Sequence, residues 1–435
     1  MNKSARRLAF EALYQTLYQD AYANLAIKDV LADAPLKQED KGYATMLVYG
    51  VLDMLLPLQK VVDATAKGKI QKKINVVLLL GAYEIKHLNK DATACNEYVK
   101  LAKEIGKGQL SGYVNGVLRN IVRGKDEKMA YCNETQRLSL SYSYPEWIIR
   151  YWMETYSSSD IEAMMAGLRD NKTITLRPNK MKCGIEQLEK IFEDKGISLK
   201  PGMIPETLVT DSFKMNIADD AYFQKGYYSI QSAGSALAVL ALDAKENTKV
   251  LDACAAPGGK TALIAEGMQD KGEVLAWDIH PHRVELIQKN STRLGLSCVK
   301  AAVQDALQYD EAYGGAFDSV LVDAPCSGLG VPRKSDIRYR ASYEGVVELA
   351  ALQLKILSNC ARYVKQGGTL VYSTCTISPL ENERVVGQFL QQTSSFRLSP
   401  LDDALFDGIR QENGMGMLYP QQYGQGFFIA RMVRL

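Results

Sequence analysis

The sequence has no closely spaced cysteines and no long apolar run. Eight cysteines occur in 435 residues, and the shortest spacing between two of them is the 15 residues from Cys360 to Cys375. Cys-x-x-Cys zinc knuckles and redox pairs therefore cannot form locally, and we expect no metal site. Glu11 and Gln15 interrupt any apolar signal core, and Val76 to Leu80 is far too short to span a bilayer. We expect a cytoplasmic protein with free thiols and no membrane contact.

The sequence also lacks a strong net charge. The total is +2, so the overall balance gives no reason to invoke nucleic acid, and a hydrophobic content of 47% is typical of a globular protein with two to four domains. Residues 1–135 carry 20 Lys and Arg against 15 Asp and Glu, a balance of +5, which leaves −3 for the remainder. A surplus this small is typical of solvated surface. The alternative is that Lys67, Lys69, Lys72 and Lys73, in one short segment, form a patch that contacts phosphate.

Residues 4–121 have helical periodicity throughout. Ala9, Leu13 and Leu17 recur every fourth residue, as do Leu47 and Val51, so each set lies on one helix face. Prolines and glycines divide this stretch into five to seven helices of ordinary length. We expect an all-α domain over residues 1–135, and we interpret the polar, aperiodic residues 123–137 as a linker.

In the next stretch, residues 136–220, short helical patterns are mixed with strand patterns. This predicts a small mixed α/β module that contacts RNA. Helical patterns cover residues 147–156, 160–168 and 184–192, and strand patterns cover residues 173–177, 197–199 and 207–210. Arg177 and Asn179 flank Pro178, where they have two interpretations: contacts to an RNA phosphate, or a turn with solvated side chains.

From residue 249 onward, strand and helix patterns alternate, which is typical of a doubly wound parallel sheet. Ligands bind such sheets outside the carboxyl ends of the strands. We predict strands at residues 250–253, 274–277, 298–302, 317–322, 369–373 and 427–433, with crossover helices that include 283–294 and 345–363.

Residues 252–261 (DACAAPGGKT) follow the first of these strands and open a helix. Small residues and two glycines let backbone N–H groups approach a ligand closely. A Walker A loop needs glycine where Cys254 stands, and the G-x-G-x-x-G dinucleotide pattern is absent. The remaining candidate is S-adenosylmethionine. Asp278, at the end of the second strand, has the placement of a carboxylate that holds ribose hydroxyls, and Asp305 after the third strand is placed to contact adenine or to cap a helix.

Two later strands end in the motifs 323–328 (DAPCSG) and 372–376 (YSTCT), so they bring two thiols to one edge of the sheet. Cytosine C5 is a poor nucleophile, and its methylation requires prior addition of a nucleophile at C6, for which a thiolate is suited. Asp323, if its acid form is favoured by burial, supplies a proton at N3. Cys326 is well placed to take the C5 proton before the thiol leaves, or to assist that step.

These motifs, with residues 331–334 (VPRK) and with Pro379, Glu381, Asn382 and Glu383, resemble those of the bacterial RNA 5-methylcytosine methyltransferases of the Nop2/Sun family. The resemblance implies a Rossmann-like methyltransferase domain over residues 221–435, with Cys375 as the nucleophile and Cys326 in product release. It also implies contacts to S-adenosylmethionine from Cys254, Ala255, Ala256, Pro257, Gly258, Gly259, Lys260, Asp278, Arg283, Asp305 and Asp323.

The N-terminal stretch, with residues 6–10 (RRLAF) and 40–44 (DKGYA), resembles the NusB-like RNA-binding domain. In front of this catalytic unit, such a domain implies 16S rRNA as the substrate, in a small-subunit assembly context. We expect a monomeric enzyme. The chain departs from the family pattern at Gln231-Ser232, where Gln-Asp is expected, and at Gln425, where Asp is expected.

Three alternatives stay open. The same chemistry on tRNA is one, and an RNA-binding assembly or antitermination factor with a vestigial catalytic domain is another. The third is a DNA cytosine methyltransferase, which would use Cys326 as its nucleophile.

Overall fold

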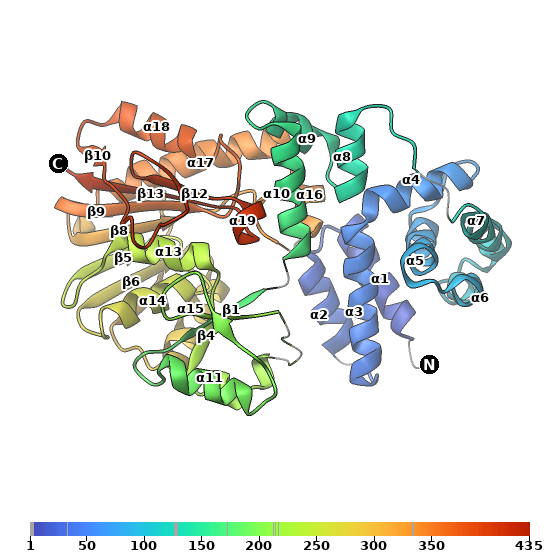
Figure 1. Cartoon of the computed structure of the whole chain (residues 1–435), viewed down its shortest axis with the longest axis horizontal. Coiled ribbons are helices and arrows are strands. Elements are labelled where there is room, and N and C mark those ends of the chain that lie inside the picture. The colour runs from blue at the N-terminus through green and yellow to red at the C-terminus, as the bar shows by residue number, and fades with distance from the viewer. Residues whose placement is uncertain are drawn as a thin grey trace. The chain divides into compact units, whose positions relative to one another are not determined.

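The computed structural model describes residues 4–32, 34–125, 129–171, 173–211, 213, 215, 217–332 and 335–435, and it divides into two compact units (Figure 1). The first unit is the chain up to Glu162 together with α16 (Ser335–Arg340), and the second begins at Ala163 and contains the remainder. The boundaries expected at residues 135 and 220 do not coincide with this division.

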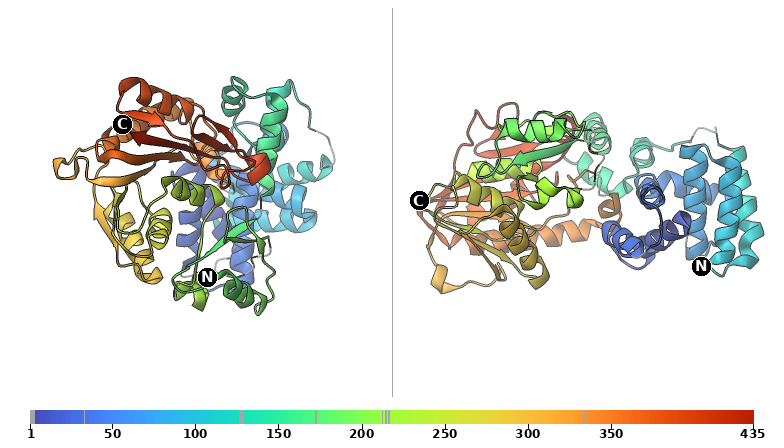
Figure 2. Two further views of the ribbon diagram at one scale, coloured as in Figure 1. Left: turned by 60° about the vertical axis from the view of Figure 1, so that its left-hand side comes forward. Right: turned by 90° about the horizontal axis from the view of Figure 1, so that it is seen from below.

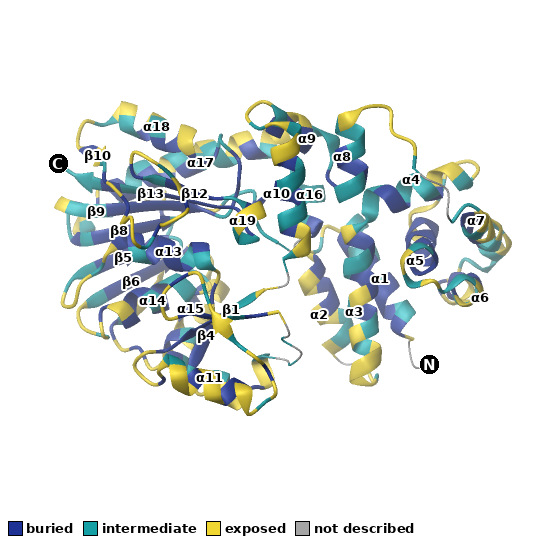
Figure 3. Cartoon of the chain, viewed as in Figure 1, coloured by how far each residue is buried: buried dark blue, intermediate teal, exposed yellow. Residues whose placement is uncertain are grey.

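The first unit is helical, as predicted, and is organised around α5 (Lys72–Leu88), which packs against α1, α3, α4, α6 and α7. The run from Val76 to Ala82 is buried on every side, which explains its uninterrupted apolar sequence (Figure 3). Gly50 lets α3 approach α5 closely, because a Cβ there would lie 2.1 Å from the Tyr83 ring. The other helices are α1 (Ala5–Tyr18), α2 (Ala23–Ala32), α3 (Gln38–Asp53), α4 (Leu55–Thr65), α6 (Asp91–Glu104), α7 (Ser111–Arg123), α8 (Glu134–Tyr142) and α9 (Glu146–Met153), with a 3₁₀ turn at Gly108–Leu110.

The linker expected at residues 123–137 is wrong at its end, because α8 begins at Glu134. Asn133 caps this helix by accepting a hydrogen bond from the Gln136 backbone N–H at 2.8 Å. Residues 126–128 of the expected linker lie outside the described part of the chain. The short length of α8, with a polar first turn, left too little periodicity to show in the sequence.

The six-residue helix α16 packs within the first unit, although it follows the Asp323–Gly328 motif in the chain. Its Asp336 carboxylate accepts from the first backbone N–H of α2 at 3.0 Å. Arg338 and Tyr339 donate to carbonyls at the end of α3, each at 2.9 Å, and Arg340 donates to a carbonyl in the α1–α2 turn at 2.9 Å. The helix therefore satisfies orphan backbone groups at two helix ends, and a carbonyl in one turn, of a domain that is far away in sequence.

The second unit begins with a four-stranded antiparallel sheet in the order β2-β3-β1-β4, packed against α11 (Ile185–Glu193). Its strands are β1 (Ile174–Pro178), β2 (Lys200–Pro201), β3 (Leu208–Thr210) and β4 (Tyr228–Ile230), and α10 (Ser158–Asp170) precedes them. The mixed α/β prediction is confirmed in kind, but the strand expected at 197–199 lies instead at Lys200–Pro201, and β4 continues the sheet past residue 220. Arg177 and Asn179 are both buried, so neither the phosphate contact nor the solvated turn is correct.

The larger sheet has the order β11-β12-β13-β9-β8-β5-β6-β7, with β10 paired to β13. Strands β5 to β9 are parallel, and β13 runs antiparallel to β9. From β5 the chain adds β6 and β7 on one side and then returns to add β8 and β9 on the other, so the switch point lies between β5 and β8. Helices α14 and α15 cover one face, and α17 and α18 cover the other (Figure 2).

The strands are β5 (Lys249–Asp252), β6 (Glu273–Asp278), β7 (Val299–Val303), β8 (Phe317–Asp323), β9 (Val364–Thr374), β10 (Phe396–Leu398), β11 (Arg410–Glu412), β12 (Met415–Leu418) and β13 (Phe427–Arg434). The helices are α12 (Ala221–Gln224), α13 (Ala233–Leu242), α14 (Gly259–Gly267), α15 (Pro281–Leu294), α17 (Tyr343–Ala361), α18 (Glu383–Gln392) and α19 (Pro420–Tyr423). The six strands predicted in this region are all present, to within a few residues at their ends. The short strands β10 to β12 were not predicted.

Among the described residues, no single helix is both long and apolar enough to cross a membrane, and α3 and α4 meet such a criterion only as a pair bent by 80°. The same residues contain no group of three or more His, Cys, Asp or Glu side chains arranged to hold a metal ion.

Candidate active site

The ends of β8 and β9 bring the two predicted thiols together. Asp323 pairs with Ser373 in the parallel register, and the Ser373 hydroxyl donates to Asp323 Oδ1 at 2.7 Å. Beyond this pair the segments that follow β8 and β9 continue side by side. The sulfur atoms of Cys326 and Cys375 are 3.0 Å apart, and the Cys375 backbone N–H donates to Cys326 Sγ at 3.3 Å.

A buried carboxylate, Glu381, fixes the loop that carries Cys326. It accepts from the Ser327 backbone N–H at 2.7 Å and from the Ser327 hydroxyl at 2.6 Å. Gln353 donates to Glu381 at 3.1 Å and to the Pro325 carbonyl at 2.9 Å, so it ties the same loop to α17. Burial raises the pKa of Glu381, against these hydrogen bonds. The sequence contains Glu381 within the family motif but gives no sign of this role.

The loop that carries Cys375 is fixed in a similar way by Asn382. Its amide accepts from the Thr374 hydroxyl at 2.5 Å and donates to the Thr376 carbonyl at 3.0 Å. The Cys375 carbonyl accepts from the Gly330 backbone N–H at 3.1 Å, which links the two thiol loops directly. Neither thiol therefore depends on a freely moving loop for its position.

Lys260, at the start of α14, reaches this pair of strand ends. Its ammonium lies 2.7 Å from Asp323 Oδ2, so both oxygens of Asp323 are hydrogen-bonded, one to Lys260 and one to Ser373. Burial by itself lowers the pKa of Lys260, but the charge and hydrogen bond of Asp323 outweigh it and raise the pKa. The thiol of Cys375 acts on Lys260 in the same direction, which places the cation beside the nucleophile candidate. The sequence predicted Lys260 only as part of the cofactor loop.

The two thiols differ in their electrostatic setting. The pKa of Cys326 is raised well above its usual value, first by its hydrogen bond to Cys375 and then by burial. A raised pKa keeps Cys326 in the protonated, poorly nucleophilic form. The partner sulfur, on Cys375, has Lys260 nearby.

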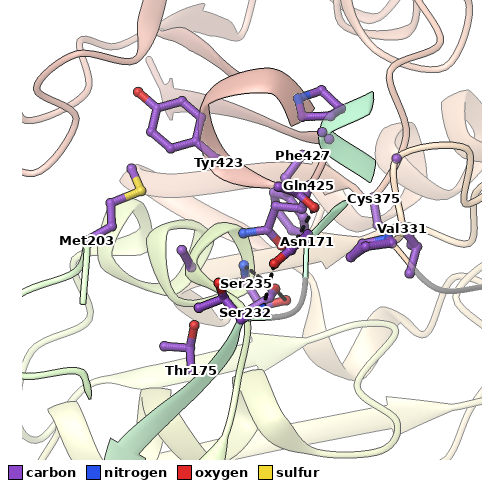
Figure 4. Close-up of a pocket in the computed structure, with 18 of the residues that line it drawn as sticks. Asn171, Thr175, Met203, Ser232, Ser235, Val331, Cys375, Tyr423, Gln425 and Phe427 are labelled. Atoms are coloured by element: carbon purple, nitrogen blue, oxygen red, sulfur yellow. Dashed lines mark hydrogen bonds between the residues drawn. The ribbon is translucent and has the colours of Figure 1, made fainter. Parts of the chain in front are cut away.

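A cavity of about 730 Å³ opens in front of these groups (Figure 4). Cys375, Lys260 and Asp323 lie among its lining residues, whereas Cys326 does not. The remaining walls come mainly from the end of α10, β1, the start of α13 and the segment 420–427, and Phe427 and Val331 lie near Cys375 (Figure 4). A ligand in the cavity therefore meets Cys375 first, and the Cys326 sulfur lies 3.0 Å behind it. Arg333 and Lys334 of the predicted motif lie outside the described residues.

The predicted donor loop lies between β5 and α14, at the switch point of the sheet. Gly258 adopts φ +98°, and a Cβ on Gly259 would meet nothing within 4 Å, so backbone there is open to a ligand. Arg283 joins the loop to the end of β6, because it donates to the Ala256 carbonyl at 3.3 Å and pairs with Asp278 at 3.2 Å. Asp278, placed by the strand order, and Arg283, implied by the resemblance, thus lie together at the loop.

Two further carboxylates lie near this loop. Asp252 is fully buried, and burial raises its pKa to about 7. Its Oδ2 accepts from the Thr261 hydroxyl at 2.7 Å, whereas its Oδ1 has no hydrogen-bond partner in the described part of the chain. Asp305 uses Oδ1 to accept from the Leu307 backbone N–H at 2.9 Å, which is a capping contact. Its predicted contact with adenine stays a prediction.

The two departures from the family pattern meet each other in space. In the amide orientation that satisfies its hydrogen bonds, Gln425 donates to Ser232 Oγ at 3.1 Å and accepts from the Gly234 backbone N–H at 3.0 Å. Gln231 accepts from the buried Arg177 at 2.8 Å and donates to the Gly259 carbonyl at 3.3 Å, so it steadies the donor loop. Two neutral residues therefore replace two expected carboxylates at one place, and the approach to the loop is intact.

Comparison with known proteins agrees with this geometry. A family model described as "16S rRNA methyltransferase RsmB/F" matches residues 239–433, and the NusB family model matches residues 3–123. The chain is 38% identical to the probable ribosomal RNA small subunit methyltransferase B of Bacillus subtilis, over 99% of this chain and 98% of the relative. It is 33% identical to the corresponding probable enzyme of Synechocystis, over 99% of both chains.

The crystal structure of PH0851 has the same fold, with a TM-score of 0.84 at 24% identity over 99% of each chain. The predicted all-α NusB-like domain followed by a Rossmann-like methyltransferase domain is thereby confirmed. On its full-length similarity to these relatives, the chain belongs to the family of the ribosomal RNA small subunit methyltransferases B.

Proposed function

We propose that this protein methylates C5 of a cytosine in 16S rRNA, through a covalent bond between Cys375 and C6 of the base. The observation that carries this proposal is the position of the two thiols: they are 3.0 Å apart, but only Cys375 lines the cavity. Lys260 and Asp323 stand in the same cavity wall, where a base that reaches Cys375 would meet them.

The methyl donor is S-adenosylmethionine, whose sulfonium supplies an electrophilic methyl group. The residues at the switch point fit this group: an open backbone at Gly259, the buried carboxylate of Asp278 and an orphaned buried oxygen on Asp252. The loop Cys254, Ala255, Ala256, Pro257, Gly258 and Gly259 would hold the amino-acid part, and Asp278 the ribose.

Attack by Cys375 requires activation of both the thiol and the base. The ammonium of Lys260 stabilises negative charge on the attacking sulfur. Addition at C6 places electron density on N3, which needs a hydrogen bond or a proton. Because Asp323 already accepts hydrogen bonds at both oxygens, the proton that the pair offers to N3 is held on Lys260, with Asp323 orienting the ammonium. General acid help of this kind contributes about 10² to 10⁴ in rate.

Release requires a base for the C5 proton, and the geometry supports Cys326 in that role. Its pKa is raised mainly by the hydrogen bond with Cys375, and the charge of Cys375 adds to the effect. Once Cys375 is bonded to C6, it neither carries that charge nor offers that hydrogen bond, so the pKa of Cys326 falls. Cys326 can then lose its proton to solvent and, as a thiolate, take the C5 proton. The C5–H electron pair re-forms the C5=C6 double bond, the C6–S bond breaks, and the Cys375 sulfur leaves as a thiolate. Formation of the adduct thereby activates Cys326, the base that releases it.

The relatives named above support small-subunit rRNA as the substrate, since both are named ribosomal RNA small subunit methyltransferase B. The same chemistry on tRNA is the remaining alternative. A vestigial catalytic domain is disfavoured by the ordered pair of thiols, and a DNA-type mechanism with Cys326 as nucleophile is disfavoured by its absence from the cavity wall.

Two cysteine variants test the role assignment. Cys375→Ala should abolish methyl transfer and form no covalent RNA adduct. Cys326→Ala should still attack but release slowly, so that a covalent adduct accumulates and is visible as a denaturing gel shift. An adduct that persists in Cys375→Ala and disappears in Cys326→Ala would show that the roles are reversed.

The substrate is tested separately by bisulfite mapping of rRNA and tRNA from a strain that lacks the gene. Loss of a 5-methylcytosine in 16S rRNA is expected. Loss of a tRNA site alone would contradict the ribosomal substrate while leaving the cysteine chemistry untouched.

A further inference from the structure

The first unit contains a polar cavity that has no part in the site described above. It has a volume of about 480 Å³ and lies between the end of α1, the body of α4, the loop 66–71 and the start of α5. It is open to solvent on one side. Its lining consists of Tyr18, Gln59, Asp63, Ala66, Gly68, Ile70 and Asn75.

The base of this cavity is a pair of side-chain amides. Asn75 donates to Gln59 Oε1 at 2.8 Å and to the Tyr18 hydroxyl at 3.1 Å, and Gln59 donates to Asn75 Oδ1 at 3.2 Å and to Asp63 at 2.7 Å. All four amide hydrogens are therefore used within the protein. What remains for a ligand is a set of acceptors, namely the two amide oxygens and the Asp63 carboxylate.

Tyr18 supplies one donor next to these acceptors. Its hydroxyl oxygen accepts from Asn75, while its own hydrogen goes to no acceptor in the described part of the chain. The cavity thus offers several acceptors beside one donor. An amino group adjacent to a ring nitrogen, as in adenine and cytosine, has the complementary pattern. Uracil presents carbonyl oxygens where the cavity already has oxygens.

The segment that lines one side of the cavity carries four lysines. Lys67, Lys69, Lys72 and Lys73 come from the loop 66–71 and the first turn of α5, and all four are exposed. Among the described residues none of them forms an ion pair, and the Lys72 ammonium lies 5.3 Å above the Tyr18 ring. These are the lysines for which the sequence left a solvated surface or a phosphate patch as alternatives. Four exposed lysines on the segment beside a hydrogen-bonding cavity are complementary to a nucleic acid backbone that carries one base into it.

We propose that this cavity binds one amino-bearing nucleotide, adenosine or cytidine, of a single-stranded RNA segment, with the flanking phosphates against the four lysines. The base amino group donates to the amide oxygens and Asp63, and the ring nitrogen accepts from Tyr18. This gives the first unit a base-selective contact with RNA, separate from the target cytosine. It does not depend on the chemistry proposed for Cys375.

The lysine part is tested with the full chain and fluorescently labelled eight-nucleotide RNAs, (A)8, (C)8 and (U)8, by anisotropy at several salt concentrations. Lys69→Gln with Lys72→Gln should weaken all three RNAs and lower the slope of log K against log salt by about 1.4, or about 0.7 for each lost phosphate contact. The matched control, Lys289→Gln with Lys355→Gln, removes two exposed lysines of the second unit and should leave the slope unchanged. Equal slopes for the two double variants would overturn the proposal.

The base-selective part is tested by Tyr18→Phe, which removes only the donor. The unaltered protein should bind (A)8 and (C)8 about fivefold more tightly than (U)8, as one net hydrogen bond would give. Tyr18→Phe should bring this ratio towards one and keep the salt slope. Equal affinity of the unaltered protein for all three RNAs would overturn the base selection. The anisotropy assay reports RNA binding without a methyl donor, whereas the cysteine variants report adduct formation and methyl transfer, so failure here is distinguishable from failure of the proposed chemistry.

Discussion

The buried ion pair between Arg6 and Glu84 offers a sharp test of what holds the first unit together. Glu84 lies on α5 with no exposed side-chain surface. Arg6 contacts both of its oxygens, with Nε at 2.8 Å from Oε1 and a terminal nitrogen at 2.9 Å from Oε2. The Tyr98 hydroxyl adds a hydrogen bond at 2.8 Å. The pair joins α1 to the central helix.

Arg6→Met should destabilise the unit by about 3 to 5 kcal/mol, because it leaves a buried carboxylate without its cation. Tyr98 still donates to Glu84, which favours the lower end of that range. Arg7→Met is the matched control on the neighbouring residue. Its pair with Glu11 is one helical turn apart at 2.8 Å and partly exposed, and such pairs contribute about 0.3 to 0.5 kcal/mol.

The stability of the first unit should depend on pH with opposite signs in the unaltered protein and in Arg6→Met. Burial by itself raises the pKa of Glu84, but the hydrogen bonds from Arg6, Tyr43 and Tyr98 and the charge of Arg6 outweigh it and lower the pKa below the ordinary value of 4.5. The stability that Glu84 contributes is therefore complete above pH 4.5 and is lost as the pH falls through its lowered folded value. In Arg6→Met burial dominates and the folded pKa rises above 4.5, so acidification relieves part of the penalty.

Hydrogen exchange of the α5 backbone amides, measured between pH 4 and pH 8, reports the stability of this unit without requiring the whole chain to unfold in one step. Arg6→Met with Glu84→Gln should recover part of the loss, because no buried charge remains. Similar losses in Arg6→Met and Arg7→Met, or a loss that does not depend on pH, would refute the reasoning.

Two further predictions concern the active site. Glu381→Ala leaves the Ser327 N–H and the Gln353 amide without their acceptor, which costs about 1 to 3 kcal/mol for each group. Methyl transfer should therefore slow at least tenfold, while binding of S-adenosylmethionine, measured by calorimetry, should be unchanged. Weakened binding of S-adenosylmethionine would contradict this. The 3.0 Å separation of the thiols predicts that a hydroperoxide converts them to a disulfide, through a sulfenic acid on one sulfur and loss of water. With excess peroxide, the sulfenic acid on Cys375 of Cys326→Ala has no partner thiol and is oxidised further to a sulfinic acid, which dithiothreitol does not reduce. Dithiothreitol should therefore restore the free Cys375 thiol, read by mass spectrometry, in the unaltered protein but not in Cys326→Ala, and equal recovery in both would count against a disulfide.

Parts of the site could be predicted from sequence because they depend on local patterns. Apolar runs that end in small polar residues placed Asp323 and Cys375 at neighbouring strand ends, and the order of the strands placed Asp278 beside the donor loop. The six predicted strands of the larger sheet followed from the same alternation, since the inner parallel strands β5, β6 and β8 are largely buried on both faces and are therefore mainly apolar.

The rest depends on contacts between residues far apart in the chain, which no local pattern records. Glu381 looks like any acidic residue before a helix, yet it is buried and holds the loop of Cys326. Arg177 looked accessible beside a proline, yet it is buried in an ion pair with Glu266. The sequence placed Lys260 only in the glycine-rich donor loop, yet its ammonium contacts Asp323 at the thiol site. In each case a charged side chain pairs with a partner that only the fold identifies.

The helix α16 has a consequence for the order in which the protein is made. The helices of the first unit leave the ribosome early, but the side chains that cap the ends of α2 and α3 come from Asp336 and Tyr339, which are synthesised after most of the larger sheet. At about 5 to 20 residues per second, the interval between Glu162 and α16 is on the order of 10 to 35 s. During that time the nascent domain has unsatisfied helix ends. Completion of the first domain therefore waits for the second, and the two cannot be separated by cutting the chain at a single point.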